Sequence, residues 1–267
     1  MTTRVENIID KLDSLLITSF SQIPKNKKVG ILFSAGVDSS LIAKYAHDLG
    51  FKPTLFTFGT EYSKDYEFAY KLANDLNLSF HYLPLNSEQI RKTAIKIIPL
   101  LKKIGVDPNI MQISLSIGFY AISKLAQQKK VNIFLSGQGS DELFGGYNKY
   151  LKLNSKNLAL KMKHDTKNLF RVDMVRDWTM TKHFGIDIYF PYLDANFIKY
   201  VQKLPISLKI KGEERKWILR QLAKQKGLPD YIFNRPKNAL QYSSGIQKIV
   251  EKLVKRNQIP DYLQTAS

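Results

Sequence analysis

The sequence predicts an α/β protein with a parallel sheet in its first half and mainly helices in its second half. Short apolar runs of strand length alternate with amphipathic helical patterns as far as residue 147. Strands that alternate with helices pair in parallel through right-handed crossovers. Beyond residue 147 the strand signal fades, and helical patterns interrupted by prolines follow. With 267 residues, 44% of them hydrophobic, the chain can bury the core of one large domain.

The elements follow from the spacing of apolar residues along the chain. Apolar positions three and four residues apart predict a first helix over residues 5–20, inside an N-terminal segment 1–26. Apolar runs predict strands over residues 29–33, 53–58, 79–83 and 131–135. Helical patterns are expected over residues 41–49, 64–76, 88–104 and 112–128. We divide the remainder into a sheet region (27–147), a helical part (148–250) and a C-terminal tail (251–267).

Composition excludes several classes of function. The chain has no cysteine, which rules out disulfides, thiolate metal sites and a cysteine nucleophile, and its four histidines lack zinc-ligand spacing. No apolar run is long enough for a membrane span, and Glu6, Asp10 and Asp13 interrupt any signal-peptide pattern. We therefore expect a soluble cytoplasmic protein without a membrane partner.

The net charge of +18 is unevenly distributed along the sequence. Residues 1–147 contain 17 basic and 13 acidic residues, whereas residues 148–267 contain 24 basic and 10 acidic residues. Solvated helix faces are the simpler interpretation of the basic second half, and a polyanionic partner such as nucleic acid is the alternative. A positively charged entrance to a site that binds nucleotide and pyrophosphate is compatible with both interpretations.

The first glycine-containing loop follows the first predicted strand and reads Ser34-Ala-Gly-Val-Asp-Ser-Ser40. A strand that turns abruptly into a helix presents free backbone N–H groups and the positive end of the helix dipole to an anion. Gly36 allows close approach of the backbone, and Ser34 and Ser39 add hydroxyl donors. Asp38 would repel phosphate unless Mg²⁺ lies between them. The alternative is that Asp38 only caps the following helix.

The second loop, Leu135–Tyr147, follows the fourth predicted strand and contains four glycines. Glycine in or beside a helix costs about 0.5–1 kcal/mol relative to alanine, so this density indicates close approach of the backbone to a ligand. Asp141 again places an acid beside the expected phosphates and is a second candidate Mg²⁺ ligand. Because the carboxyl ends of neighbouring parallel strands meet at one edge of a sheet, we expect both loops to form one site.

The two loops carry a family resemblance. The first resembles the pyrophosphate-binding loop of the ATP-pyrophosphatase, or PP-loop, superfamily. The second closely resembles the signature of the synthetase domain in the asparagine synthetase family. Weaker matches follow in the same order along the chain at Val172–Asp177, Phe190–Asp194, Glu214–Arg220 and Asn234–Asn238. The resemblance covers residues 27–250 and implies the three-layer ATP-pyrophosphatase fold, also called adenine nucleotide alpha hydrolase-like, with a mainly helical C-terminal part.

The resemblance also implies a reaction and its participants. Synthetase domains of that family activate a carboxylate with ATP, release pyrophosphate and let an amine displace AMP from the acyl-adenylate. It thus implies an AMP-forming carbon–nitrogen ligase with ATP as substrate and Mg²⁺ as cofactor. The best match for the acceptor is the aspartate side chain, as in asparagine biosynthesis, and ammonia would supply the nitrogen.

The implied site residues fall into three sets. ATP and pyrophosphate would be held by Leu32, Phe33, Ser34, Gly36, Asp38, Ser39, Phe58, Ser136 and Gly137. Magnesium would be bound by Asp38 and Asp141. The residues with implied catalytic roles are Lys237 at the α-phosphate and acyl intermediate, Lys216 at the pyrophosphate, and Gln138.

Three positions depart from the family pattern. Ala35 replaces a usual glycine, which is tolerable if that residue does not need a positive φ. Gln138 stands where asparagine synthetases carry a glutamate thought to serve the amine-attack step, and an amide cannot accept a proton at neutral pH. Residues 108–114 contain no arginine where the family often has one near its amino-acid substrate.

The nitrogen source leaves alternatives open. Asparagine synthetases usually carry a glutaminase domain with an N-terminal cysteine nucleophile, and this sequence contains no cysteine. We therefore expect free ammonia or a separate glutaminase subunit to supply the amine, in which case the chain is the nucleotide-binding synthetase subunit. A PP-loop tRNA-modifying enzyme is a further alternative favoured by the basic second half, but such enzymes lack the Gly-Gly-Tyr loop.

Lys237→Ala should strongly reduce AMP formation while leaving the fold intact. Fixed cations beside the transferring group stabilise the charge that develops there. AMP release can be followed with purified protein, with circular dichroism as the folding control. Near-normal AMP formation would refute the role assigned to Lys237.

Overall fold

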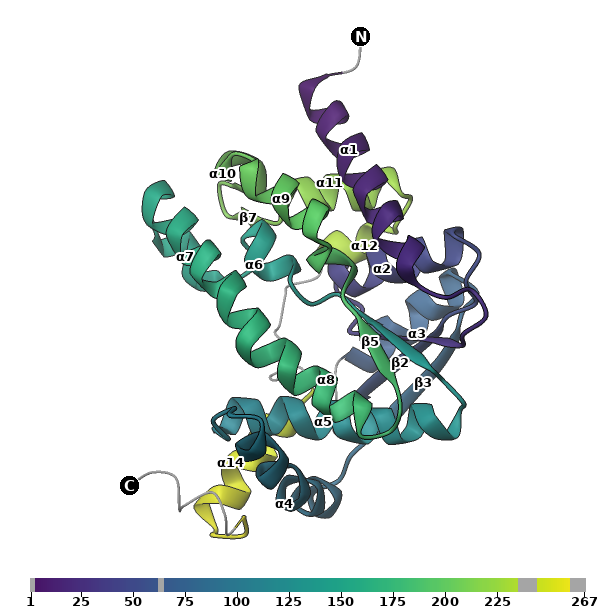
Figure 1. Cartoon of the computed structure of the whole chain (residues 1–267), viewed down its shortest axis with the longest axis vertical. Helices are drawn as coiled ribbons and strands as arrows, with labels where there is room; N and C mark the ends of the chain where they lie inside the picture. Colours follow the sequence, from purple (N-terminus) through teal and green to yellow (C-terminus); the bar gives the residue numbers. More distant parts are fainter. Residues whose placement is uncertain (1–2, 62–64, 235–243, 260–267) are drawn as a thin grey trace.

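The computed structural model describes residues 3–61, 65–234 and 244–259, which surround a five-stranded parallel sheet (Figure 1). The strand order is β3–β2–β1–β4–β5. The strands are β1 (Val29–Leu32), β2 (Thr54–Gly59), β3 (Ser79–Pro84), β4 (Ile133–Ser136) and β5 (Asp187–Tyr189). The four predicted strands are confirmed to within two residues at each end. The fifth strand was missed because three residues are too few to show an alternating pattern.

Helices make up most of the remaining described chain. The α-helices are α1 (Arg4–Ser19), α2 (Val37–Asp48), α3 (Asp65–Asp75), α4 (Ser87–Lys103), α5 (Ile110–Gln128), α6 (Ser140–Phe144), α7 (Ser155–Asn168), α8 (Met174–Lys182), α9 (Ala195–Lys203), α10 (Ile206–Lys209), α11 (Trp217–Gln225), α12 (Asp230–Asn234) and α14 (Ile246–Lys255). A π-helical segment, η3 (Leu169–Asp173), joins α7 to α8. A hairpin of β6 (Ile210–Lys211) and β7 (Glu214–Arg215) precedes α11. None of these helices is both long enough and apolar enough to cross a membrane.

The order of the strands fixes where a ligand can bind. From β1 the chain adds β2 and then β3 on one side, and it later places β4 on the other side of β1. The register pairs Leu32 of β1 with Phe56 of β2 and with Ser136 of β4. In open α/β sheets ligands bind outside the carboxyl ends of the strands at such a switch point. Both glycine-rich loops begin there, directly after β1 and β4.

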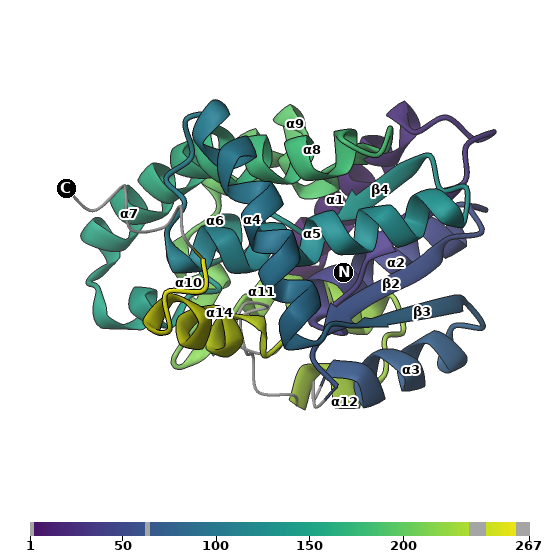
Figure 2. The same ribbon diagram turned by 90° about the horizontal axis from the view of Figure 1, so that it is seen from below.

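Two hydrophobic cores cover the two faces of the sheet. One contains Ile31 and Leu135 of the sheet together with residues of α1, α2, α9 and α11. The other contains Phe56 and Phe134 with residues of α4, α5, α8 and α14. Figure 2 shows α5 running along the sheet with α4 packed beside it. Successive side chains of a strand point to opposite faces of the sheet, so helices pack on both faces. The result is three layers, with the sheet between two layers of helices.

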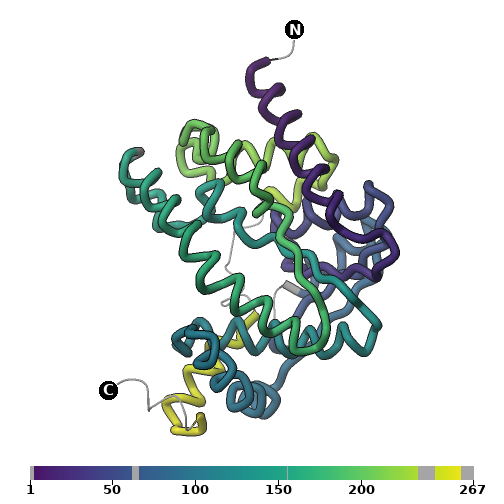
Figure 3. The backbone as a smooth tube through the Cα atoms, viewed as in Figure 1, coloured from purple at the N-terminus to yellow at the C-terminus, as the bar shows by residue number. Residues whose placement is uncertain are grey.

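The first and last described helices belong to these cores, although Figure 3 shows them at opposite ends of the molecule. Helix α1 begins with a capping box between Thr3 and Glu6, and it packs against α9 and α11. Helix α14 packs against α4 and α5 and runs across the predicted boundary between residues 250 and 251. The N-terminal helix therefore packs as part of the domain.

Leu12→Ala should lower the free energy of unfolding by about 2–5 kcal/mol, because it removes a fully buried side chain of α1 from the core. Urea denaturation measures the change. Ile17→Ala on the same helix is the matched control, since that side chain is 39% exposed and should change stability by less than about 0.5 kcal/mol. Equal effects of the two substitutions would show that α1 is not part of the core.

Candidate active site

A cavity of about 700 Å³ opens at the carboxyl ends of β1 and β4. The first loop contributes Ser34, Asp38 and Ser39 to its wall, and the second loop contributes residues from Ser136 to Asp141 except Ser140. Side chains of the sheet make part of its wall apolar, and side chains of α6, α7 and η3 make another part polar. The two loops therefore face one shared space.

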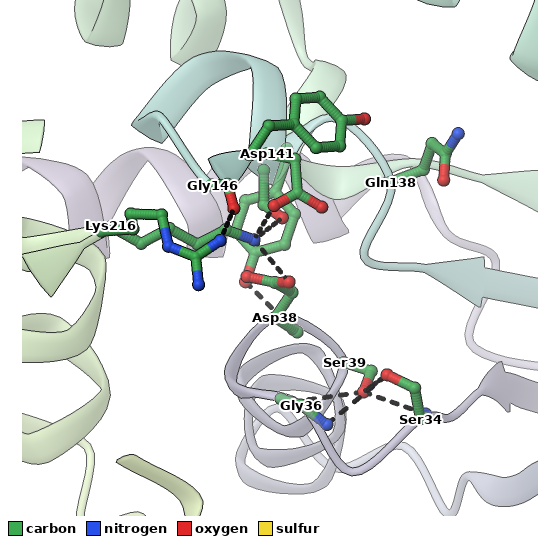
Figure 4. A network of polar contacts seen from close by, with 12 residues as sticks. Ser34, Gly36, Asp38, Ser39, Gln138, Asp141, Gly146 and Lys216 are labelled. Atoms are coloured by element: carbon green, nitrogen blue, oxygen red, sulfur yellow. Dashed lines mark hydrogen bonds and ion pairs between the residues drawn. The ribbon is translucent and has the colours of Figure 1, made fainter. Parts of the chain in front are cut away.

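The first loop gathers hydroxyl groups at the start of α2. Ser39 Oγ lies 3.2 Å from Ser34 Oγ and accepts the Ser34 backbone N–H at 3.2 Å (Figure 4). Gly36 is the N-cap residue of α2 and receives no side-chain cap, so the first backbone N–H groups of the helix point toward the space an anion would occupy. The interpretation of Asp38 as a side-chain cap of this helix is not supported.

Ala35 does adopt the left-handed conformation, with a φ of 53°. Alanine was expected to be tolerable here only if this residue did not need a positive φ, and the structure shows that its φ is positive. Left-handed backbone costs a non-glycine residue about 1–2 kcal/mol, and strain of this kind concentrates at functional sites. Ala35 is fully buried in the core beside the loop, so packing holds the turn in this shape.

Lys216 joins the two loops. Its ammonium lies 2.6 Å from Asp38 Oδ2 in the first loop and 2.8 Å from Asp141 Oδ1 in the second (Figure 4). It also donates to Ser140 Oγ at 2.9 Å. A lysine ammonium has three N–H donors, so these three oxygens match its full capacity. Lys216, which was predicted to bind pyrophosphate, therefore bridges Asp38 and Asp141, which were predicted to bind magnesium.

The surroundings of Lys216 are unusual for a lysine. Its side chain is 2% exposed, and its backbone adopts a left-handed conformation with φ 57° immediately before α11. Burial lowers the pKa of the ammonium, while the nearby Asp38 carboxylate acts in the opposite direction. Non-glycine residues in this conformation persist only where the surrounding structure holds them.

Glycines allow the loops to approach so closely. A Cβ atom added to Gly137 would lie 3.1 Å from both Asp38 Cβ and the Ser39 backbone nitrogen. A Cβ atom on Gly146 would lie 1.7 Å from Asp141 Oδ1 and 2.2 Å from Lys216 Cε. Contacts with the first loop and with Lys216 therefore explain Gly137 and Gly146, whereas Gly139 and Gly145 leave room for Leu193 and Ile210.

The Phe190–Asp194 segment holds both loops from outside. Tyr192 donates a hydrogen bond from its hydroxyl to the Asp38 carbonyl oxygen at 3.1 Å. Leu193 fills the space beside Gly139, whose missing Cβ atom would lie 2.3 Å from Leu193 Cδ2. Asp194 caps α9 through the backbone N–H groups of Asn196 and Phe197. Asp194 therefore has a structural role at the start of α9.

The apolar part of the cavity wall contains three of the residues predicted to bind ATP. Leu32, Phe33 and Phe58 line it together with Phe56. Phe58 takes this position because Gly118 of α5 leaves room for its ring; a Cβ atom there would lie 2.0 Å from Phe58 Cε2. The rings and the sheet form an apolar wall against which a planar base could stack.

The carboxylates of Asp38 and Asp141 fit a divalent cation. Both bind one ammonium, so their oxygens already converge on one positive centre. Two carboxylates alone do not complete a magnesium site, and the described residues contain no group of three or more acidic or histidine ligands. Mg²⁺ commonly binds one or two carboxylates and takes its other oxygens from substrate phosphates and water.

The polar end of the cavity contains residues to which the sequence analysis assigned no role. Arg176 is 1% exposed and forms ion pairs with Asp177 and Asp173, both at 2.7 Å. Its Nη1 also donates to Gln112 Oε1 at 2.6 Å. Burial lowers the pKa of its guanidinium, but the two carboxylates outweigh this and raise it overall. Residues 108–114 contain no arginine, but Arg176 of α8 contacts this segment through Gln112.

Glu142 and Tyr147 also line the cavity. Both lie inside the glycine-rich signature, which was the signal that could have singled them out. The Tyr147 hydroxyl donates to Glu142 Oε1 at 2.5 Å. Lys149 and Arg171 add positive charge at the same end of the cavity.

The predicted site residues differ in where they lie. All the predicted ATP ligands except Gly36, the N-cap residue of α2, line the cavity, and Lys216 is buried between the loops. Gln138 lines the cavity but lies apart from the Lys216 cluster in Figure 4. Among the described residues its side-chain amide has no hydrogen-bond partner. Lys237 lies outside the described residues.

The sheet order and the paired glycine-rich turns at its switch point define the class: an α/β protein with a five-stranded parallel sheet and a ligand site at the carboxyl ends of its strands. Comparison with known sequences identifies the family. The model of the asparagine synthase family matches residues 11–165 and 161–265. The chain belongs to this family.

Similar proteins include "Putative asparagine synthetase 1", a glutamine-hydrolyzing protein by name, from Methanocaldococcus jannaschii. It is 34% identical over 265 residues, which cover 86% of this chain and 48% of that protein. The glutamine-hydrolyzing asparagine synthetase of Gallus gallus is 33% identical over 234 residues, covering 84% of this chain and 41% of that protein. The chain thus spans about half the length of the curated relatives it matches.

Among solved structures, the NMN synthetase of Francisella tularensis aligns over 97% of both chains at 12% identity. Its TM-score is 0.36. An NH3-dependent NAD synthetase from Campylobacter jejuni aligns with the same TM-score at 16% identity, covering 89% of this chain and 100% of that chain. TM-scores this low carry no argument, and the description of the chain rests on its sheet order and its family match.

Gly146→Ala should reduce AMP formation by about 100-fold, because its methyl group would displace Asp141 and Lys216 and misplace the loops. Gly212→Ala is the control: it puts a methyl group in open space four residues before the same lysine in the sequence, although it adds strain at a φ of +61°. Steady-state AMP release measures both. Equal activities of the two variants would contradict the importance of this close approach.

Proposed function

We propose that the chain is an ATP-dependent, AMP-forming amide ligase that adenylates a carboxylate and transfers ammonia to it. The observation that carries this proposal is the convergence of the two glycine-rich loops on Lys216 at the switch point of the sheet. Membership of the asparagine synthase family supports the use of ATP and small-molecule substrates. The best candidate for the acceptor is the aspartate side chain.

The cavity divides naturally between the two substrates. The apolar wall at Phe58 would hold adenosine, and the hydroxyls of Ser34 and Ser39 would hold pyrophosphate beside the start of α2. When bound, Mg²⁺ would be held by Asp38 and Asp141 and would neutralise phosphate charge. The polar end beside Arg176 would hold the acceptor carboxylate, with the planar guanidinium buried and fixed by its ion pairs.

Lys216 would stabilise the charge of the leaving pyrophosphate. In the structure its ammonium binds Asp38, Asp141 and Ser140, so entering phosphate oxygens must share or take over these contacts. A fixed cation at the leaving group lowers the barrier because negative charge grows there in the transition state. Lys237 would act on the α-phosphate by the same principle.

The source of nitrogen is part of the proposal. Two of the relatives are named as glutamine-hydrolyzing. We propose that ammonia is the nucleophile that attacks the acyl-adenylate, supplied either free or by a glutaminase. Titrating ammonia and glutamine with the purified chain distinguishes these sources. A nucleic-acid partner and a cytoplasmic location stay predictions.

Isotope exchange between pyrophosphate and ATP tests the first half-reaction. Exchange should depend on both Mg²⁺ and an acceptor acid, with aspartate as the first candidate. Asp141→Ala should reduce exchange by at least about 100-fold, because it removes a charge partner of Lys216 and an oxygen ligand. Asp187→Asn is the control, since it changes an exposed aspartate on β5 outside the cavity. Absence of exchange with every amino acid offered would contradict the proposed function.

A further inference from the structure

Three basic side chains line the cavity: Lys149, Arg171 and Arg176. Lys149 and Arg176 both form ion pairs with aspartates of the cavity wall. Arg171 is exposed, and within residues 3–61, 65–234 and 244–259 it forms no hydrogen bond or ion pair. Arg171 is therefore the basic residue of the cavity wall whose guanidinium these segments leave available to a ligand.

The guanidinium of Arg176 has no free edge for a carboxylate. Its Nε donates to Asp177 Oδ1 at 2.8 Å, and its Nη1 donates to Gln112 Oε1 at 2.6 Å and to Asp173 Oδ1 at 2.7 Å. Its Nη2 lies 2.7 Å from Asp177 Oδ1. Bidentate binding of a carboxylate takes one N–H from each of two nitrogens, Nη2 with either Nε or Nη1. Because the hydrogens of Nε and Nη1 are all engaged, Arg176 can offer a ligand only an N–H of Nη2.

The π-helical segment η3 places Arg171 on the cavity side of its helix. In a regular α-helix, residues five positions apart point about 140° away from each other. In η3 the Met174 backbone N–H bonds to the Leu169 carbonyl oxygen five residues earlier, as in a π-helix. This wider turn brings residues five positions apart toward one side, and Arg171 lines the same cavity as Arg176.

We propose that Arg171 is a specificity-determining residue that binds the non-reacting carboxylate of an acidic amino acid; this rests on the proposed ligase function. Aspartate, the first candidate acceptor, has two carboxylates: the side-chain carboxylate is adenylated, and the α-carboxylate stays free. A guanidinium with all five N–H groups available matches this second carboxylate by two parallel hydrogen bonds. Arg176 keeps only Nη2, which can orient the reacting carboxylate by a single hydrogen bond.

Arg171→Gln and a pair of acids test the assignment. β-Alanine is aspartate without its α-carboxylate, so it retains the carboxylate that would react. In pyrophosphate–ATP exchange, Arg171→Gln should raise KM for aspartate about 10–100-fold, the range for loss of hydrogen bonds to a charged group. KM for ATP, KM for β-alanine and the exchange rate at saturating aspartate should stay within about threefold of wild type, because the change removes a binding contact made only by the α-carboxylate.

Two further variants separate the fork of the guanidinium from its charge. Arg171→Lys keeps the charge without the planar fork, so it should restore part of the affinity for aspartate. Lys167→Gln is the matched control, because it removes one positive charge from the exposed end of α7 outside the cavity wall. It should leave KM for aspartate unchanged. An equal rise of this KM in Lys167→Gln and Arg171→Gln would overturn the assignment, since the effect would then come from the general positive charge.

The remaining outcomes separate the assignment from the function on which it rests. Unchanged KM for aspartate in Arg171→Gln would overturn the assignment, as would equal increases for aspartate, β-alanine and ATP, which indicate a phosphate contact or a disturbed fold. Exchange with acids of one carboxylate but with no acidic amino acid would overturn the assignment and leave the proposed function standing. Exchange with no acid at all would contradict the proposed function, and the assignment of Arg171 with it.

Discussion

The ion pairs of Lys216 with Asp38 and Asp141 are the interaction on which the rest of the site depends. One ammonium connects the loop after β1, the loop after β4 and the start of α11. Removing one partner of a buried ion pair typically costs about 3–5 kcal/mol, because it leaves a charge without compensation. The left-handed backbone of Lys216 and the absence of a side chain at Gly146 are local costs of placing the ammonium there.

This arrangement gives the two ends of the cavity different chemistry. The sheet and the rings of Phe56 and Phe58 make one end apolar, whereas α6 and η3 supply ionisable groups at the other. The π-helical segment η3 places Arg171 and Asp173 in the cavity wall, and such segments often occur at functional sites. Four of the five acidic side chains that line the cavity form ion pairs with basic side chains.

Local patterns in the sequence predicted the parts of this structure that depend on neighbouring residues. Apolar runs predicted four strands, and glycine density predicted both loops and the edge of the sheet at which they meet. The missed parts depend on distant contacts: Lys216 binds Asp38 across 178 positions, and Arg176 binds Gln112 across 64. Strand β5 was too short to show a pattern, and the positive φ of Ala35 depends on how the core holds the turn.

The most direct test of the central claim is a crystal structure of the chain with Mg²⁺ and a non-hydrolysable ATP analogue. The account predicts a triphosphate held between the turns at Gly36 and Gly139, with adenine against Phe58 and phosphate oxygens within hydrogen-bond distance of Lys216. Nucleotide bound elsewhere on the protein, with the ion pairs of Lys216 undisturbed and the cavity empty, would contradict it.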